Sequence, residues 1–230
     1  MPPCRFSWAG VVLISTLGLT ACTLLPPTLS GARQTLFSGQ DFQAWQHRNQ
    51  EKCQWYLVEE KAMEIRPGQG GDLLTKESWG DFFLHLEFLI PEARREGSSG
   101  SGAEPEAHSG VFLHGRYEIQ IIDSHGQEPS TQSCGSIPLR KAPDRNACRP
   151  PGQWQSFDIS FRAPRFDGHG NVVRNPRIKV MQNGVLIHDE VEIFGTSPGG
   201  LDWFQVEEGP VMLQDGGLAV RFRNLWCQKL

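Results

Sequence analysis

Short runs of alternating apolar and polar residues recur along most of this chain. The clearest run covers residues 81–90, where one set of side chains is uniformly apolar: Phe82, Leu84, Leu86, Phe88 and Ile90. Alternation with a period of two is typical of a strand that buries one face. Shorter runs bounded by glycine, proline, asparagine or aspartate predict further strands at residues 55–59, 62–66, 72–75, 154–161, 177–182, 185–189, 211–214 and 220–226.

Helical periodicity is nearly absent, and the chain shows neither an internal repeat nor heptads. Asn183-Gly184, between two of the predicted strands, is a strong signal for a type I′ hairpin turn. About 195 residues remain after residue 34, a length that suits one large β sandwich. We therefore predict an all-β fold in which residues 35–230 form a single antiparallel sandwich of two sheets.

The segment 108–123 is the strongest candidate for the place where chemistry occurs. It divides at Gly115 into two predicted strands. In the second strand Glu118 and Gln120 share one face, opposite three apolar residues. A sheet face of this kind is either a solvated outer surface or the floor of a polar cleft. We expect the cleft.

Residues 1–22 resemble a bacterial lipoprotein signal peptide. Arg5 precedes an apolar run over residues 8–19, which is too short to span a membrane, and Leu19-Thr-Ala-Cys22 matches the lipobox, whose cysteine is lipidated. An ordinary secretory signal with an incidental cysteine is the alternative. We expect a lipidated Cys22, a tether over residues 23–34 and a location in the bacterial cell envelope. Thr23 in place of Asp favours the outer membrane, facing the periplasm or the surface.

The formal net charge of −4 becomes slightly more negative once the signal peptide and its Arg5 are removed. This balance argues against nucleic-acid binding, which needs a basic face. Nothing in the pattern fixes the oligomeric state.

Four cysteines remain after Cys22 and allow up to two disulfides in an exported chain, with three connectivities: Cys53, Cys134, Cys148 and Cys227. We favour Cys134 with Cys148, because that bond would clip the irregular segment 124–151. A zinc site is less well supported, because no CxxC pair with matching histidines occurs.

Several segments, in order, resemble the 3-keto-disaccharide hydrolase family over residues 35–230. They are Leu36-Phe-Ser-Gly-Gln-Asp41, Gly80-Asp-Phe82, Ser109-Gly-Val-Phe112, Tyr117-Glu-Ile-Gln-Ile-Ile-Asp123, Gly152-Gln-Trp154, Asn183-Gly-Val185, Gly209-Pro-Val-Met-Leu-Gln-Asp-Gly216 and Phe222-Arg-Asn-Leu-Trp226. The resemblance implies a concanavalin A-like jelly roll, which agrees with the all-β prediction. The chain departs from the family at His108, where asparagine is usual, at Gly216, where histidine is usual, and in a longer insertion at 92–107.

The resemblance also implies an exported enzyme that cleaves 3-keto glycosides. Proton abstraction beside the keto group, followed by elimination and addition of water, gives net hydrolysis. Such a site needs a base, a stabiliser of the enolate oxygen and a proton source. Our catalytic candidates are Glu118, Glu87, Asp123 and His114. Our substrate-binding candidates are Gln120, Arg116, Ser109, Trp154, Gln214 and Asp215. A divalent ion could act as a Lewis acid, with Glu118 and Gln120 as candidate ligands.

Two other functions stay open. The first is a non-catalytic carbohydrate-binding module that uses tryptophans as stacking platforms, with Trp45, Trp79, Trp154 and Trp203 as candidates. The second is a glucanase acting on unoxidised glycans, since Glu118 to Asp123 resembles the E-x-D-x-x-E string with Gln120 in place of the middle acid. A regular strand places Glu118 and Asp123 on opposite faces, and only a bulge would bring them together.

Overall fold

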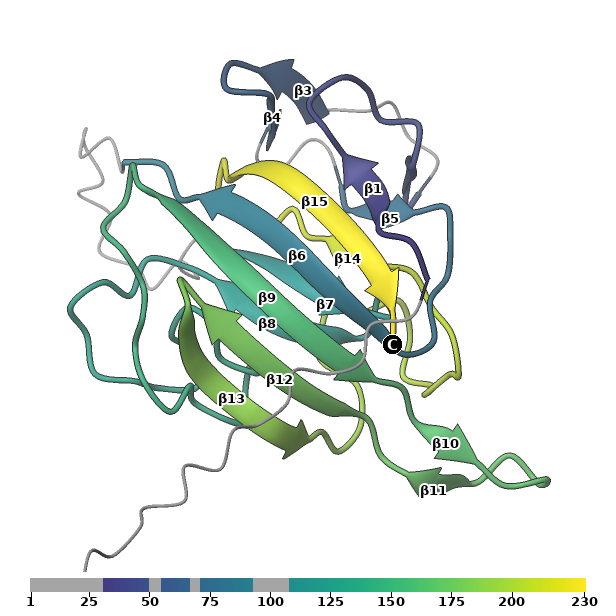
Figure 1. The fold of residues 1–230 in the computed structure, drawn as a ribbon. Coiled ribbons are helices and arrows are strands. Elements are labelled where there is room, and N and C mark those ends of the chain that lie inside the picture. The colour runs from purple at the N-terminus through teal and green to yellow at the C-terminus, as the bar shows by residue number, and fades with distance from the viewer. Residues whose placement is uncertain (1–30, 50–54, 67–70, 93–107) are drawn as a thin grey trace, which may run out of the picture.

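The computed structural model describes residues 31–49, 55–66, 71–92 and 108–230. These residues form fifteen strands and no helix, and thirteen of the strands build two antiparallel sheets that pack face to face (Figure 1). None of the described residues lies in a helix suited to crossing a membrane. The predicted all-β sandwich is therefore confirmed.

The larger sheet has eight strands. Their order is β13 (Val185–Glu192), β12 (Arg177–Gln182), β9 (Trp154–Arg162), β6 (Phe82–Leu89), β15 (Arg221–Lys229), β4 (Ala62–Ile65) and β3 (Trp55–Val58), and β1 (Gln34–Phe37) also pairs with β15.

The smaller sheet has five strands. Their order is β2 (Trp45–His47), β5 (Leu73–Thr75), β14 (Met212–Leu213), β7 (Ser109–Leu113) and β8 (Tyr117–Ile121). A separate two-stranded ribbon, β10 (Arg165–Phe166) and β11 (Val172–Arg174), projects from one end of the sandwich (Figure 1).

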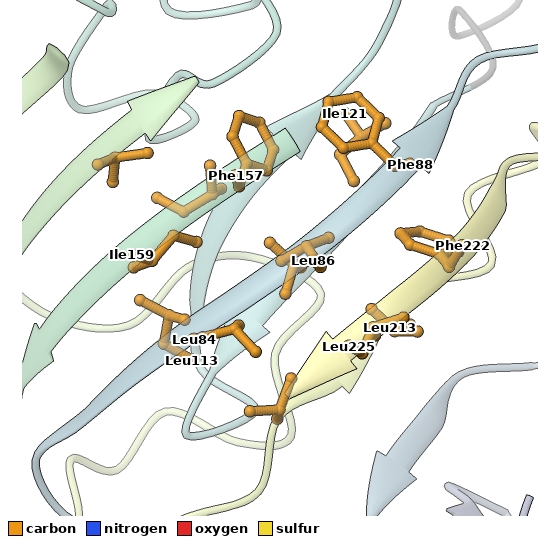
Figure 2. Packing of buried hydrophobic residues seen from close by; sticks show 14 of the residues in the cluster. Leu84, Leu86, Phe88, Leu113, Ile121, Phe157, Ile159, Leu213, Phe222 and Leu225 are labelled. Atoms are coloured by element: carbon orange, nitrogen blue, oxygen red, sulfur yellow. The ribbon is translucent and has the colours of Figure 1, made fainter. Parts of the chain in front are cut away.

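The core lies between the two sheets. The larger sheet contributes buried side chains such as Leu86 and Phe157, and the smaller sheet contributes Leu113, Ile121 and Leu213 (Figure 2). Along β6 every second residue is fully buried and the others are half-buried, as the alternation predicted. Burial of this apolar surface is the main stabilising contribution to the sandwich.

The Asn183-Gly184 turn is confirmed. Both residues have positive φ angles, of 52° and 78°, as a type I′ turn requires, and the turn joins β12 to β13. The structure adds four short strands that the pattern did not predict: β1, β2, β10 and β11. The signal peptide, most of the tether, the insertion at 93–107 and Cys53 lie outside the described residues.

Candidate functional site

The outer face of the five-stranded sheet carries a row of polar residues. Strand alternation puts Glu118 and Gln120 of β8 on this face, because Ile119 and Ile121 point into the core. Gly110 of β7 lies opposite Gln120, and the backbone N–H of Gln214 donates to the Gly110 carbonyl (3.0 Å). Neighbouring strands therefore bring together side chains that are distant in sequence.

The other half of the same face is apolar. Leu74, Phe112 and Met212 form a small buried cluster across β5, β7 and β14, and Leu201 packs on it. The polar row thus borders a covered apolar floor, so it lies at the edge of a desolvated region rather than on an open surface.

Glu118 is the most unusual residue of the row. Its side chain is only 4% exposed, and burial, together with the negative charge of Asp72, raises the pKa of Glu118 to about 8. Its backbone N–H donates to Ser197 Oγ (3.0 Å), while its Oε1 has no hydrogen-bond partner among the described residues. A buried carboxyl with an unused oxygen is costly for folding and is typical of functional sites.

Asp72 and Arg48 form an ion pair at the far side of the row. The Arg48 Nη1–Asp72 Oδ2 distance is 2.9 Å, and Asp72 Oδ1 accepts the Asp215 backbone N–H (2.9 Å). Arg48 also donates to the carbonyls of Gly199 (3.0 Å) and Gly200 (2.7 Å). Arg48 therefore holds in place the carboxylate of Asp72, whose negative charge acts on the buried carboxyl of Glu118.

His108 faces Gly216 across an isolated antiparallel bridge, and its N–H donates to the Gly216 carbonyl (3.1 Å). Strand alternation places His108 on the same face as Gly110. A Cβ atom at position 216 would lie 2.4 Å from the His108 carbonyl oxygen and 3.0 Å from its ring Cδ2. The two departures from the family pattern are thus direct neighbours, and the glycine leaves room for the histidine.

Two loop segments cover the edge of β8 that pairs with no strand of the sheet. Gly135 and Ser136 pair with the backbone of Gln120, with N–H to O distances of 2.8 and 3.0 Å, and the Ser197 N–H donates to the Arg116 carbonyl (2.7 Å). Arg140 joins these segments, because it donates to the carbonyls of Phe194 and Thr196. Loops therefore form the side wall of the polar row.

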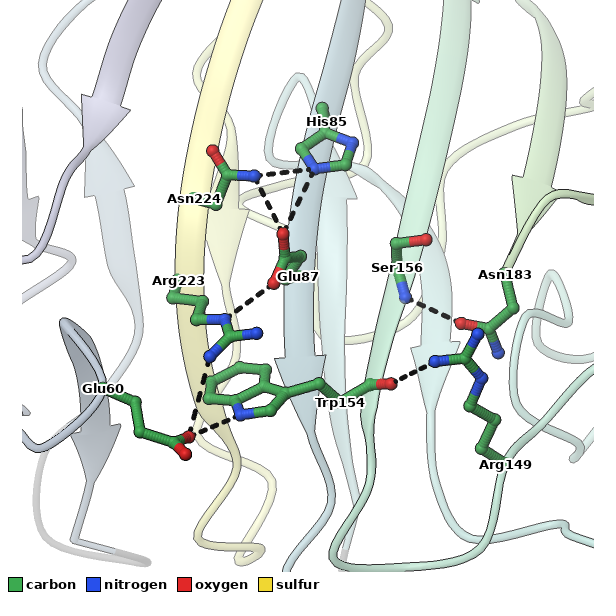
Figure 3. Close-up of polar contacts among 9 residues, drawn as sticks. All are labelled: Glu60, His85, Glu87, Arg149, Trp154, Ser156, Asn183, Arg223 and Asn224. Carbon is green, nitrogen blue, oxygen red and sulfur yellow. Dashed lines mark hydrogen bonds and ion pairs between the residues drawn. The ribbon is translucent and has the colours of Figure 1, made fainter.

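The structure places two predicted residues on the other sheet. Glu87 and Trp154 lie on the outer face of the eight-stranded sheet, where Glu87 binds Arg223 (2.7 Å) and Asn224 (2.9 Å), and the Arg223 guanidinium stacks over the Trp154 ring at 3.9 Å (Figure 3). The Trp154 ring N–H donates to Glu60 (2.6 Å). Since the core separates this face from the other, neither residue can act together with Glu118.

Two more predicted residues hold the turn between β7 and β8. His114 is fully buried against Phe82 and Phe161, its Nε2 lies 3.0 Å from the Gly80 carbonyl, and burial lowers its pKa. Arg116 forms an ion pair with Asp202 and donates to the His114 carbonyl (2.8 Å). Both side chains are used within the fold.

The remaining predicted residues divide between the row and its surroundings. Gln214 lies in the row and Asp215 borders it. Ser109 is fully buried, and its hydroxyl donates to the Gln214 carbonyl (2.9 Å), so it supports the row from the core side. Asp123 is exposed beyond the end of β8 and accepts the His125 N–H (3.0 Å). The register from β7 to β8 is regular, so no bulge turns Asp123 toward Glu118.

Within the described residues, no group of three histidine, cysteine, aspartate or glutamate side chains gathers as metal ligands. Asp72 is held in an ion pair with Arg48. The remaining candidate metal ligands are the two predicted from the sequence, Glu118 and Gln120. These described side chains do not fit a divalent ion held by the protein alone.

Four further residues of the site are not among those predicted from the sequence: Arg48, Asp72, His108 and Ser197. The alternation that placed Gly110 on the outer face would also have placed His108 there. Arg48, Asp72 and Ser197 reach the site through pairings over long sequence separations, which leave no local signal.

A comparison with protein families matches residues 32–228 to the domain described as 3-keto-alpha-glucoside-1,2-lyase-like. The chain belongs to this family. The resemblance inferred from the sequence segments is thereby confirmed, and so is a role in acting on glycosides.

Solved structures agree with the family assignment. A provisionally named glycosyl hydrolase from Parabacteroides distasonis is 29% identical, with a TM-score of 0.71 over 86% of this chain and 84% of its own. A second such protein from the same organism is 18% identical, with a TM-score of 0.63 over 86% of this chain and 94% of its own, and shares the fold. The comparison with curated proteins returns no match.

Proposed function

We propose that this family member cleaves 3-keto glycosides, with Glu118 as the base that removes the proton from C2. The observation that carries the proposal is the buried Glu118 carboxyl, whose pKa is raised to about 8 and whose Oε1 has no partner among the described residues. The family description names a lyase-like domain for 3-keto glucosides, which supports the same reaction class.

The chemistry begins at the keto group. The C3 carbonyl acidifies the hydrogen on C2, so a base can take that proton and leave an enolate. The enolate then expels the glycosidic oxygen from C1, and a C1–C2 double bond forms. The departing oxygen takes up a proton. Addition of water across this bond completes a net hydrolysis without any change in oxidation state.

Glu118 suits the first step. A catalytic base works best when its pKa lies near the working pH, and a carboxylate with a pKa of about 8 is a stronger base than an ordinary glutamate. The apolar floor beside it keeps the carboxyl desolvated, which maintains this raised pKa.

The neighbouring residues suit the other steps. His108 can supply the proton that the leaving oxygen needs, because a histidine side chain can act as a general acid. The amides of Gln120 and Gln214 can bind sugar hydroxyls or the enolate oxygen, and Arg48 adds positive charge at the edge of the row.

The test is turnover of a 3-keto glucoside and of its unoxidised parent by the purified protein. We expect cleavage of the keto sugar only, and a loss of about 10²–10⁴ in rate for Glu118→Gln. The matched control is Glu87→Gln on the other sheet, which should keep wild-type turnover. Turnover that survives Glu118→Gln in a folded protein would remove Glu118 from the mechanism.

The two alternatives give different results in the same assay. Cleavage of the unoxidised parent would identify a glucanase. Sugar binding without turnover would identify a binding module. Among the candidate tryptophan platforms, Trp45 and Trp79 are buried at 3% and 2% exposure, and the Trp154 ring is stacked under Arg223. Trp203 is 73% exposed, so a binding module would depend mainly on Trp203.

We also propose that Cys22 is lipidated and anchors the protein in the cell envelope. The support is the order of basic residue, apolar run and Leu-Thr-Ala-Cys at residues 5–22. Cys22→Ala should leave an unprocessed or unanchored form, whereas wild type should fractionate with membranes. Wild-type protein recovered from the cytoplasm would contradict the proposal.

A further inference from the structure

An arginine-lined hollow lies at one end of the sandwich. Its volume is about 530 Å³, and its lining includes four arginines, which we call the terminal arginine patch: Arg162, Arg165, Arg174 and Arg177. Asp81 and Glu190 also line the hollow. Such a concentration of guanidinium groups is notable in a chain whose net charge is −4.

The charges of this end are arranged with the cations outward. Arg162 and Arg165 both bind Asp81, at 3.2 and 2.7 Å, and their side chains are 46% and 47% exposed, against 14% for Asp81. Arg177 is 46% exposed and makes a 3.5 Å contact with Glu192. The guanidinium groups of Arg162 and Arg165 therefore keep donors free for an external anion above the less exposed Asp81, while Glu190 is exposed at the same hollow.

The β10–β11 ribbon extends from the same place and carries exposed apolar residues. Val172 is 38% exposed and Val173 is 63% exposed, and both lie in β11 beside Arg174. Arg165 starts the ribbon and pairs with Arg174 across it. Figure 1 shows the ribbon projecting beyond the body of the sandwich. Exposed valines next to Arg174 match a membrane interface, where apolar side chains enter and cations stay at the phosphates.

The described chain also begins at this end. The carbonyl of Gly31 accepts a hydrogen bond from Gln228 Nε2 (3.0 Å), and the Leu230 N–H donates to the Asp81 carbonyl (3.2 Å). Eight residues lie between Cys22 and Gly31, and the nine Cα–Cα steps from one to the other span at most about 30 Å when the chain is extended. A lipid on Cys22 would therefore hold this end of the domain close to the bilayer.

We propose that the terminal arginine patch docks on the phosphate groups of an anionic phospholipid surface, with Val172 and Val173 in the interface. The proposal rests on the lipid anchor at Cys22 and is independent of the proposed chemistry at Glu118. Each arginine that approaches an anionic surface strengthens the attraction, and salt screens it. The domain would thus sit on the membrane in one orientation instead of moving freely on its tether.

The test uses the full lipoprotein, processed in a bacterial host and reconstituted into vesicles that contain phosphatidylglycerol or into neutral phosphatidylcholine vesicles. Hydrogen exchange is followed in peptides that cover residues 163–176, with the turn at Asn183-Gly184 as an internal reference. We expect exchange in the ribbon to slow about tenfold on the anionic vesicles only, and added salt to reverse the effect.

Two charge reversals of equal size provide the control. Arg174→Glu should abolish the slowing. Arg66→Glu should not, because Arg66 follows β4 on the other side of the sheet order and stacks on Tyr56 at 4.5 Å. Unchanged exchange in β6 and β9 would show that both variants fold. Val173→Ser should weaken the slowing without a change in charge.

Several results would overturn the proposal. They are equal exchange on both kinds of vesicle, equal loss of the slowing in the two arginine variants, and the same slowing with inorganic phosphate in detergent, which would indicate a small-anion site. Flotation with neutral vesicles reports the anchor separately, and protein that does not float would remove the premise. Turnover of a keto sugar reports the chemistry and does not enter this comparison.

Discussion

Gly110 lies directly beneath the carboxyl group of Glu118. A Cβ atom at position 110 would approach Glu118 Oε1 to 2.6 Å and its Cγ to 3.0 Å, closer than real Cβ contacts allow. The glycine therefore makes the space that the buried carboxyl occupies. This relationship connects the smallest residue of β7 to the proposed base on β8.

The first prediction is that Gly110→Ala lowers turnover of a 3-keto glycoside by about tenfold or more, because the methyl group displaces the base from its position. Gly168→Ala is the matched control, since a Cβ there meets no atom within 4 Å. Steady-state kinetics and a thermal melt check both variants. A fully active Gly110→Ala protein would show that the position of Glu118 does not matter.

The second prediction concerns stability and pH. Because the pKa of Glu118 is raised from 4.5 to about 8 in the folded state, the folded protein binds a proton that the unfolded chain releases between these pH values. Stability should therefore fall as the pH rises from 4.5 to 8. Glu118→Gln removes this titration, so the variant should gain stability over wild type at pH 8, by roughly a few kcal/mol at most. Urea denaturation at pH 5 and pH 8 measures the difference, and identical pH dependence in both proteins would contradict it.

The third prediction is the pH profile of catalysis. A base must be deprotonated to act, so kcat/KM for a 3-keto glucoside should rise with pH and level off above about 8, where Glu118 is ionised. An acid with the same pKa would lose activity over this range. A profile that falls toward pH 8 would assign Glu118 the role of proton donor.

The fourth prediction tests His108. If this histidine protonates the leaving oxygen, His108→Gln should lower kcat for a poor leaving group by about 10²-fold or more and have a smaller effect on an activated aryl glycoside. His169→Gln, in the exposed turn of the β10–β11 ribbon, is the control. Equal losses on both substrates would indicate a role in folding or binding rather than in proton transfer.

The fifth prediction is a disulfide between Cys134 and Cys148. Both side chains are buried free thiols in the structure, and the hydrogen bond from Cys134 lowers the pKa of Cys148 to about 6. Thiol–disulfide exchange with an oxidised dithiol donor would transfer two electrons to the donor and join the two sulfurs. Closure of this loop should stabilise the fold by about 3 kcal/mol.

Alkylation of the denatured, exported protein checks this pairing. Cys134 and Cys148 should escape modification, whereas the buried Cys227 should react. The double variant Cys134→Ser/Cys148→Ser should melt earlier than the oxidised wild type and at a similar temperature to the reduced form. Two reactive thiols at 134 and 148 in the exported protein would refute the prediction.

The sequence was sufficient for features that depend on near neighbours along the chain. Alternation in β6 and β8 predicts which face of each strand points into the core, and Asn183-Gly184 predicts its turn, because both follow from backbone geometry over a few residues. The shared face of Glu118 and Gln120 follows from the same rule. These features need no knowledge of which strands are neighbours.

Two predicted catalytic residues, Glu87 and His114, lie away from the site, because of strand order in one case and a turn conformation in the other. Glu87 was grouped with Glu118, but β6 pairs with β9 and β15 in the larger sheet, while β8 pairs with β7 in the smaller one. His114 is another predicted catalytic residue, but its positive φ of 53° puts it in a turn, where its side chain packs against Phe82 and Phe161. Pairing over long separations and a turn conformation of this kind leave no period in the sequence.

The loops that cover the edge of β8 bear on how relatives could evolve specificity for different sugars. The proposed base stands on a strand fixed by its register with β7, whereas the wall beside it is built from Gly135, Ser136 and Ser197, which belong to connecting loops. Insertions in loops cost little free energy compared with changes inside a sheet. The loops that contact the sugar can therefore diverge among related proteins while the position of the reactive carboxyl stays fixed. Specificity and chemistry can evolve separately in this fold.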